Sequence, residues 1–289
     1  GIHFDDFELN LHGPYQTVPM PLKTFDNVSI ADVPYGLYVN DTYLTPLPGQ
    51  ATFENVEANF TTMLTAYDIA EERHLQATAL PWQTDGIFNE DPIVIEAGVE
   101  LQLTADCPFG GCGDGSVTAQ GELRLEGTEA APISIHPKAG DVIGAWYLNR
   151  LIGTHVNIAG PFAGDDEDCA LSFNELTLTD SSVSGAPGLA ALCADYDVSL
   201  DRLTIEDASY GLRVASMQVK NVGSNNTYTN VGANYVSAKD GNFELTGSNT
   251  WLAQGIPWFV DDDLQVDGGT WTLEAGVELE LAGESMFLS

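Results

Sequence analysis

A long internal repeat restricts the folds open to this chain more than any other feature of its sequence. The segment DNVSIADVPYGLYV at residues 26–39 aligns with DRLTIEDASYGLRV at residues 201–214, an offset of 175 positions. Three shorter matches follow in the same order at offsets of 175 to 178: 55–59 with 230–234, 81–82 with 257–258, and 96–103 with 274–281. Four ordered matches with so little drift are typical of repeat proteins whose units stack on their neighbours.

The repeat divides the chain into two unequal units. We interpret residues 1–105 as the later part of a first unit and residues 106–289 as a second, nearly complete unit of one continuous solenoid. The first residues, GIHFDD, contain neither the basic segment nor the apolar segment of a signal peptide, and they do not begin with an initiator Met. We therefore expect a processed chain or a fragment of a longer protein, with a further unit after Ser289.

Short segments in which apolar and polar residues alternate recur along the whole chain. Examples are VELQL at residues 99–103 and RLTI at residues 202–205. A period of two is typical of strands with one buried face, and Gly, Asn, Asp or Pro separates the segments. The best helical candidate, Thr61–Gln76, contains β-branched residues and has weak caps. The chain is therefore predicted to be all-β.

Many short strands suit a sandwich, a propeller or a parallel β-solenoid, and three observations favour the solenoid. The alternating segments recur roughly every 20 to 25 residues, which suits one coil per recurrence. Phrases such as NVSI and RLTI place a polar corner before a pair of inward apolar residues. The long repeat also preserves the order of its matches, as stacked coils would.

One stretch of about 50 residues resembles a known family. Residues 97–103, 115–135 and 144–146 resemble the right-handed parallel β-helix proteins of bacterial cell surfaces. The phrase that carries the resemblance consists of Gly121, Leu123, Gly127, Thr128, Pro132, Ile133 and Trp146. The resemblance implies an all-β, right-handed parallel β-helix (β-solenoid) with irregular loops. Leu125 departs from the family pattern, in which a small residue precedes the turn.

The charge of the chain has almost entirely one sign. The 289 residues include 43 Asp plus Glu and 9 Lys plus Arg, so the net charge is −34, while 44% of the residues are hydrophobic. This apolar content argues against intrinsic disorder. Nine scattered cations cannot form a basic surface for nucleic acid, and no apolar segment approaches the length that membrane insertion requires. We therefore expect neither partner.

Four cysteines give two candidate disulfide bonds. Cys107 and Cys112 lie in the short segment CPFGGC, and Cys169 and Cys193 would form the second pair. Two disulfides, free buried thiols and a zinc site all remain open, although the spacing matches no common zinc motif. An even cysteine count suits an oxidising, extracellular location. There the four sequons, at Asn27, Asn40, Asn59 and Asn225, would be candidate glycosylation sites.

Two acidic clusters are candidate calcium sites. Asp165, Asp166 and Asp168 follow a Gly-rich segment, and Asp261, Asp262 and Asp263 follow a Trp-Phe-Val segment. Clustered carboxylates supply the hard oxygen ligands that calcium prefers. Neither cluster matches an EF-hand or a calcium-binding nonapeptide repeat, so the alternative is a solvated acidic loop. Calcium is the only cofactor that the sequence suggests.

An enzyme is the main alternative to a binding protein, because parallel β-helices include polysaccharide lyases and glycoside hydrolases. Asp201, Glu206 and Asp207 lie on or beside neighbouring predicted strand ends and could converge as hydrolytic carboxylates. Asp26 and Asp32 occupy matching places in the first copy, which favours polar corner residues instead. The five histidines are scattered, and no nucleophile or phosphate-binding motif is present. We therefore assign no catalytic residue.

Several aromatic residues recur in both copies of the repeat. Tyr35 corresponds to Tyr210 and Trp82 to Trp258, and the dipeptide Trp146-Tyr147 adds another pair. Exposed rings would stack on sugars, whereas rings inside a solenoid would stack on one another. Packing is our preferred interpretation. Thr177 and Thr179 form the one short threonine ladder, which is too little for ice binding.

These observations favour a non-catalytic extracellular protein with a structural or adhesive role at a cell surface. Its expected partners are glycans or surface proteins, with calcium as a stabilising ion. The alternatives are a carbohydrate-active enzyme and a subunit that self-associates along the solenoid axis into fibres, because uncapped solenoid ends are open sheet edges.

A thermal melt tests the calcium hypothesis. If the acidic clusters bind calcium, millimolar calcium raises the Tm and a chelator reverses the rise, because a ligand that binds only the folded state stabilises it. Sodium chloride at matched ionic strength is the control. An equal rise with sodium chloride would show that the salt only screens repulsion among the carboxylates.

Overall fold

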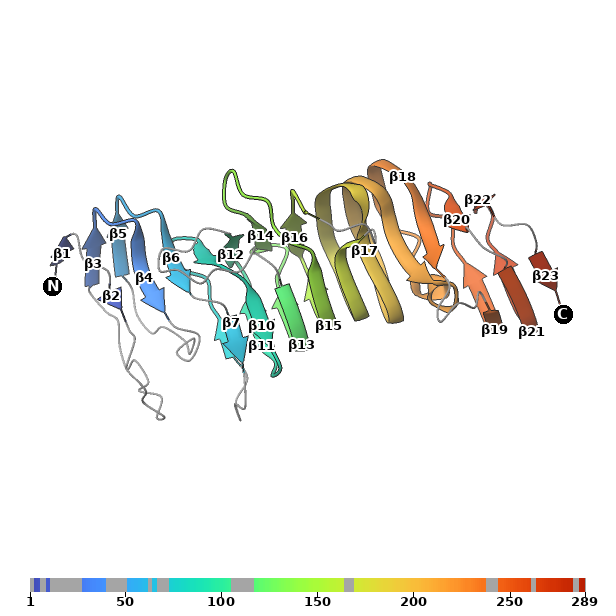
Figure 1. Cartoon of the computed structure of the whole chain (residues 1–289), viewed down its shortest axis with the longest axis horizontal. Coiled ribbons are helices and arrows are strands. Elements are labelled where there is room, and N and C mark those ends of the chain that lie inside the picture. The colour runs from blue at the N-terminus through green and yellow to red at the C-terminus, as the bar shows by residue number, and fades with distance from the viewer. Residues whose placement is uncertain are drawn as a thin grey trace.

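The computed structural model shows an elongated stack of parallel β-strands that follow one another in chain order (Figure 1). It describes residues 3–5, 9–10, 28–39, 51–61, 64–66, 73–104, 117–163, 169–237, 244–260, 264–282 and 286–288. In these residues every ladder that joins two named strands is parallel. The predicted fold class is confirmed: the chain is all-β and coils as a parallel β-helix with irregular loops.

In the middle of the chain each coil contributes to three parallel ladders, and a strand pairs with the strands of the coils before and after it. In the first half of the chain the strands are β1 (His3–Asp5), β2 (Leu9–Asn10), β3 (Val28–Ala31), β4 (Tyr35–Val39), β5 (Ala51–Glu54), β6 (Ala58–Thr61), β7 (Leu64–Ala66), β8 (Arg73–Leu75), β9 (Trp82–Thr84), β10 (Ile87–Asn89), β11 (Ile93–Glu96), β12 (Glu100–Leu103), β13 (Val117–Glu126) and β14 (Ile133–Pro137). Strand β11 pairs with β8 and β13, for example, while β12 pairs with β9 and β14.

The second half continues the same coil. Its strands are β15 (Trp146–Thr154), β16 (Val156–Ala159), β17 (Cys169–Ala215), β18 (Thr227–Ser237), β19 (Glu244–Trp251), β20 (Trp258–Val260), β21 (Leu264–Leu273), β22 (Leu279–Leu281) and β23 (Met286–Leu288). Strand β17 spans 47 residues and includes several corners, at which residues such as Asp180, Arg202 and Asp207 have positive φ angles. Several side-chain hydrogen bonds between neighbouring coils join residues 22 to 25 positions apart, as the predicted period requires. Other coils are longer: Ile93 pairs with Leu123 and Glu100 pairs with Ser134.

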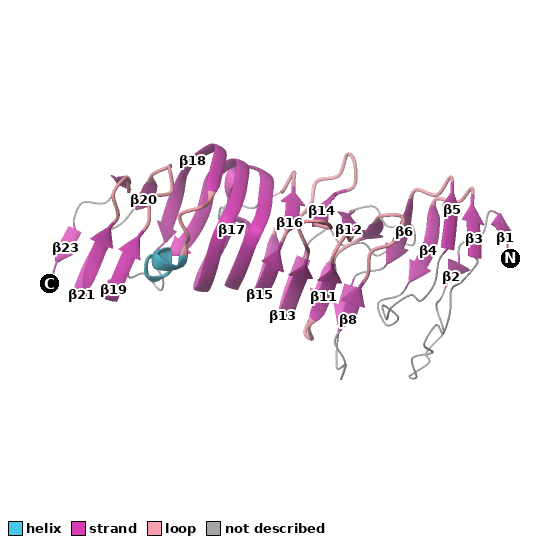
Figure 2. Ribbon diagram, turned by 180° about the vertical axis from the view of Figure 1, so that it is seen from behind, coloured by secondary structure: helices cyan, strands magenta, loops and turns pink. Residues whose placement is uncertain are grey.

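The one helix in the described residues is a short 3-10 helix, η2 (Ser216–Asn221), which lies at the edge of the strand stack (Figure 2). The described residues of the weak helical candidate Thr61–Gln76 contain no helix, in agreement with the all-β prediction. Strand β6 ends at Thr61, and β7 and β8 lie in the rest of this range. Strand β7 pairs with β10, and β8 pairs with β11. This pairing with the next coil holds both segments in the extended conformation, because it outweighs a weak local preference for helix.

The interior of the coil is filled by the apolar member of each alternating pair. In β12 the side chains of Leu101 and Leu103 are fully buried, whereas that of Glu100 is exposed. Trp82, Trp146 and Trp258 are also buried, so the packing interpretation of the recurring tryptophans is confirmed. Burial of each such side chain contributes about 1.5–3 kcal/mol, which makes the stacked core the main source of stability.

The sequence repeat has a structural counterpart at the corners. Asp207 and Asn230 adopt φ angles of 55° and 54°, and Asn230 Nδ2 donates to Asp207 Oδ1 at 2.9 Å. Asp32 and Asn55 in the first copy adopt φ angles of 58° and 53°, and their side chains make the same hydrogen bond at 2.7 Å. Asp and Asn tolerate the left-handed region better than other non-glycine residues. The matching residues are therefore corner residues of successive coils.

The Tyr-Gly-Leu phrase of both copies also has a packing reason. A Cβ on Gly211 would lie 2.7 Å from the Tyr228 ring of the next coil, and a Cβ on Gly36 would lie 2.6 Å from the Phe53 ring. Only glycine allows the next coil's aromatic ring to pack this closely. The proposed boundary between the units lies in residues 105–116, outside the described residues, and remains a prediction.

The structure also bears on the glycosylation sequons. Asn59 is fully buried, and its Nδ2 donates to Thr78 Oγ1 at 3.0 Å, so the folded chain has no room for a glycan there. Asn225 is exposed. Asn27 and Asn40 lie outside the described residues.

The corner at Asn230 gives a stability test. We expect Asn230→Val to lower the free energy of unfolding by about 2 kcal/mol, because a β-branched residue is strained at positive φ. Asn230→Gly, which allows the same backbone conformation, should cost less than about 1 kcal/mol. Urea unfolding measures both. Equal losses would assign the effect to the hydrogen bond with Asp207 and not to the backbone.

Candidate functional site

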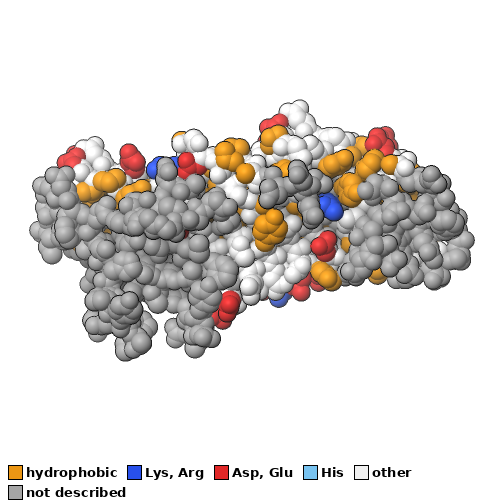
Figure 3. All heavy atoms as spheres, viewed as in Figure 1, with side chains coloured by type: hydrophobic (Ala, Val, Ile, Leu, Met, Phe, Trp, Pro, Cys, Tyr) orange, Lys and Arg blue, Asp and Glu red, His pale blue; other side chains and the backbone are white. Residues whose placement is uncertain are grey.

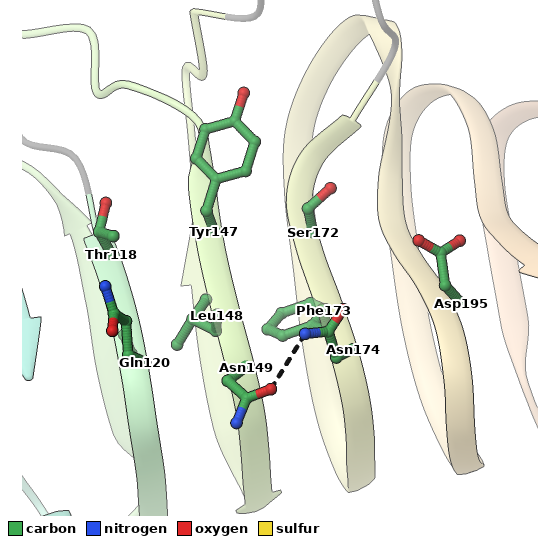
Figure 4. Close-up of a pocket in the computed structure, with 10 residues that line it drawn as sticks. Thr118, Gln120, Tyr147, Leu148, Asn149, Ser172, Phe173, Asn174 and Asp195 are labelled. Carbon is green, nitrogen blue, oxygen red and sulfur yellow. Dashed lines mark hydrogen bonds between the residues drawn. The ribbon is translucent and has the colours of Figure 1, made fainter. Parts of the chain in front are cut away.

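An open groove of about 610 Å³ lies across neighbouring strands near the middle of the β-helix (Figure 4). Four consecutive coils line it, through β13, β15 and two segments of β17. The lining residues are Thr118, Ala119, Gln120, Tyr147, Leu148, Asn149, Ser172, Phe173, Asn174 and Asp195. The groove therefore runs across the strands, along the axis in which the coils stack.

Strand register sets the positions of the polar side chains. Thr118 pairs with Tyr147, and Tyr147 pairs with Ser172, so these three residues form one row across the sheet. Asn149 and Asn174 lie beside this row, and Asn174 Nδ2 donates to Asn149 Oδ1 at 3.0 Å (Figure 4). Rows of this kind arise because parallel strands in register place equivalent residues side by side.

Successive side chains of each strand point alternately into the core and outward. The inward side chains form the floor of the groove, and the outward ones supply its polar and aromatic groups. Leu148 and Phe173 point into the core and are 4% and 3% exposed. Their neighbour Tyr147 points outward and is 58% exposed, the largest exposed fraction of any large hydrophobic or aromatic side chain in the described residues. A flat ring held above polar side chains offers an apolar face next to hydrogen-bonding groups.

The groove carries little net charge for so acidic a protein. Asp195 is the one ionisable carboxylate among its lining residues, and none of them is a cation. The nearby Arg150 is held by Glu122 at 3.1 Å and by Glu175 at 3.3 Å. Figure 3 shows acidic and basic side chains scattered over the described residues that are visible in that view. The groove is thus mainly a neutral polar surface.

A disulfide bond ties together two of the strand segments that line the groove. Cys169 and Cys193 are bonded, which confirms this predicted pair. Cys169 lies three residues before Ser172, and Cys193 lies two residues before Asp195. The crosslink therefore limits how far these segments can separate. Cys107 and Cys112 lie outside the described residues, and their pairing remains a prediction.

The candidate calcium ligands also fall outside the described residues: Asp165, Asp166 and Asp168 in 164–168, and Asp261, Asp262 and Asp263 in 261–263. Within the part of the chain that the structure describes, no group of three or more His, Cys, Asp or Glu side chains is placed to hold a metal ion. Calcium binding at the two clusters therefore stays a prediction.

Asp201, Glu206 and Asp207, the carboxylates considered for a hydrolase, pair with neighbouring residues of the coil. Asp201 contacts Arg202 and accepts from Asn225 Nδ2 at 3.1 Å, while Asp207 accepts from Asn230. Arg202 also pairs with Asp180 in the preceding coil, and this hydrogen bond lowers the pKa of the Asp180 carboxyl. Glu206 lies beside the Asp207 corner and pairs in register with Thr229. These contacts agree with a corner role for the group.

The recurring tyrosines also pack along the outside of the coil. Tyr210 contacts Tyr235 with ring centroids 5.5 Å apart, and Tyr235 contacts Phe259 at 5.7 Å. Tyr35 contacts Phe60 at 5.2 Å in the first copy. Packing therefore explains these rings, whereas Tyr147 makes no aromatic contact of this kind among the described residues.

The sequence pattern alone does not reveal the groove, and the packing interpretation is wrong for Tyr147, whose ring is largely exposed. The signal that would have found it is the alternation around Trp146: a buried tryptophan places Tyr147 on the outer surface. Which outward residues of β13 and β17 lie beside Tyr147 depends on register, and the irregular loops between these strands hide the register in the sequence.

Comparisons with protein-family models, with curated proteins and with solved structures find no match to this chain. The assignment to a parallel β-solenoid therefore rests on the strand arrangement itself. Among the described residues no helix has the length and apolar character needed to cross a membrane. A disulfide bond is typical of proteins in oxidising, extracytoplasmic compartments.

Removal of the disulfide tests its contribution. Replacing Cys169 and Cys193 together by Ser should lower the free energy of unfolding by about 3 kcal/mol, since the bond closes a loop of 24 residues in the unfolded chain. Urea unfolding of the variant and of oxidised wild type measures the difference. Reduced wild type should behave as the variant does. An unchanged unfolding free energy would contradict the prediction.

Proposed function

We propose that this chain is a non-catalytic extracellular protein with a structural or adhesive role, and that it contacts a glycan or a surface protein through the groove around Tyr147. The observation that carries the proposal is the groove itself. It combines one largely exposed aromatic ring with outward carboxamide and hydroxyl groups on a regular scaffold. Binding sites often have this combination of an apolar surface and a few placed polar groups.

The location supports the same proposal. The Cys169–Cys193 bond fits an oxidising compartment, and the segment around Gly121 and Trp146 resembles β-helix proteins of bacterial surfaces. An elongated β-helix is a suitable spacer at a surface because its coils stack along one axis (Figure 1). The strongly acidic surface suits a saline or calcium-rich exterior, where ions screen its repulsion.

The small number of carboxylates in the groove favours a binding function over glycan cleavage. Most glycoside hydrolases use two carboxyl groups that face the scissile bond from opposite sides. The lining residues supply one, Asp195. A lyase acting on uronates needs a cation for the substrate carboxylate, and none of the lining residues supplies one.

Binding and cleavage assays on surface glycans and surface proteins test this function. We expect retention of the protein on at least one such surface with no new reducing ends or unsaturated sugars. Tyr147→Ala should reduce retention, because the ring is the main exposed apolar group of the groove. Its circular dichroism should match wild type, since Tyr147 is 58% exposed.

The enzyme alternative predicts a different result. Release of sugar products that is lost in Asp195→Asn, or in Asp201→Asn combined with Asp207→Asn, would replace the binding proposal by a catalytic one. Retention that is unchanged in Tyr147→Ala would place the contact surface elsewhere on the β-helix.

A further inference from the structure

We infer that the groove binds an uncharged oligosaccharide that lies along the axis of the β-helix, with one sugar ring stacked on Tyr147. This inference rests on the proposed function and names the ligand class of the same site. It follows from the direction of the groove, from the hydrogen-bonding groups in it and from the charge around it.

The direction comes from the register of the strands. Thr118, Tyr147 and Ser172 belong to three successive coils, and Asp195 belongs to the fourth. Strands in a sheet are roughly 4.8 Å apart, so four strands cover about 14 Å along the axis. An extended sugar chain advances by about one strand spacing per residue, so about three sugars fit with one facing each gap between strands.

The hydrogen-bonding groups suit hydroxyls. The Asn174–Asn149 hydrogen bond uses one donor and one acceptor, which leaves the other carboxamide groups of both residues available to a ligand. Gln120 adds a third carboxamide, and Thr118 and Ser172 add hydroxyls. These side chains both donate and accept, as a sugar hydroxyl does. Asp195 adds a pure acceptor that can bind two neighbouring hydroxyls.

The charge argues against an anionic sugar. A uronate, sulfated or sialylated chain would enter beside Asp195 on a protein of net charge −34. Two arginines lie close to these strands. Glu122 and Glu175 hold the guanidinium of Arg150, and the guanidinium of Arg213 lies over the Tyr235 ring, with its Nη1 4.0 Å from Cys169 Sγ. A neutral sugar chain is not repelled by the negative charge of the protein, and its hydroxyls can still form hydrogen bonds with the polar side chains of the groove. The same field would attract a basic peptide, but among the lining residues only Asp195 could form an ion pair with it.

The groove is preorganised for such a ligand. Its polar side chains extend from paired strands, the two asparagines hold each other, and Cys169–Cys193 links the segments that carry Ser172 and Asp195. A site that is already ordered loses less conformational entropy on binding. Weak individual contacts to a neutral sugar can then add up to measurable affinity.

Calorimetric titration of the oxidised protein tests the inference. The probes are neutral gluco-, manno- and galacto-oligosaccharides, uronate oligosaccharides of matched length, and a lysine-rich peptide. We expect a neutral series to bind with an affinity that levels off at about three sugars. The affinity should be the same at low and high salt, because a neutral ligand releases no counterions and feels no screened field.

The variants separate stacking from other contacts. Tyr147→Ala should weaken binding of the neutral chain roughly tenfold, and Tyr147→Phe should retain most of it, since the ring face makes the contact. Tyr196→Ala is the matched control: Tyr196 is 49% exposed and is not among the lining residues. This control should leave the affinity unchanged.

Two results would overturn the inference. One is tighter binding of the uronate series or the peptide than of any neutral chain, with an affinity that falls as salt rises. The other is binding of a neutral chain that Tyr147→Ala leaves intact. Either result would still be compatible with the proposed role at a surface. Failure of the protein to bind any glycan or surface protein would contradict both the proposed function and this inference.

Discussion

In-register pairing between neighbouring coils is the constraint on which the rest of this structure depends. An inward side chain such as Leu101 is covered only when the coils before and after it place their own apolar residues at the same height. Burial of such a side chain is worth about 1.5–3 kcal/mol, and a hydrogen bond at a corner about 1 kcal/mol. Packing of the inward side chains therefore contributes most of the stability of the fold. The hydrogen bonds at the corners help to keep neighbouring coils in register.

The same pairing organises the few cations of an acidic chain. Arg150 bridges Glu122 in the preceding coil and Glu175 in the next one, and Arg202 bridges to Asp180. Such exposed pairs contribute about 0–1 kcal/mol each, so they do not hold the coil together. Their effect is local: they offset repulsion where acidic residues of successive coils would otherwise stack directly on one another.

The groove is a consequence of this regularity. Alternation buries Trp146 and exposes Tyr147, and register then places Thr118 and Ser172 on either side of the ring. These side chains lie next to one another because the parallel strands that carry them are paired in register, and no loop takes part in placing them. A repeating surface of this kind matches a repeating ligand, which is the physical link between the fold and the proposed glycan contact.

The sequence by itself determined the all-β class and indicated a corner at Asp207, because these depend on local alternation and on the backbone preferences of single residues. It also identified the Cys169–Cys193 pair as a candidate. Only the tertiary structure decided which strands pair, such as β7 with β10 and β8 with β11, and that Tyr147, Asn149 and Asn174 share one groove. These features depend on which residues of the next coil lie alongside, and loops of unequal length between the strands remove that information from the linear pattern.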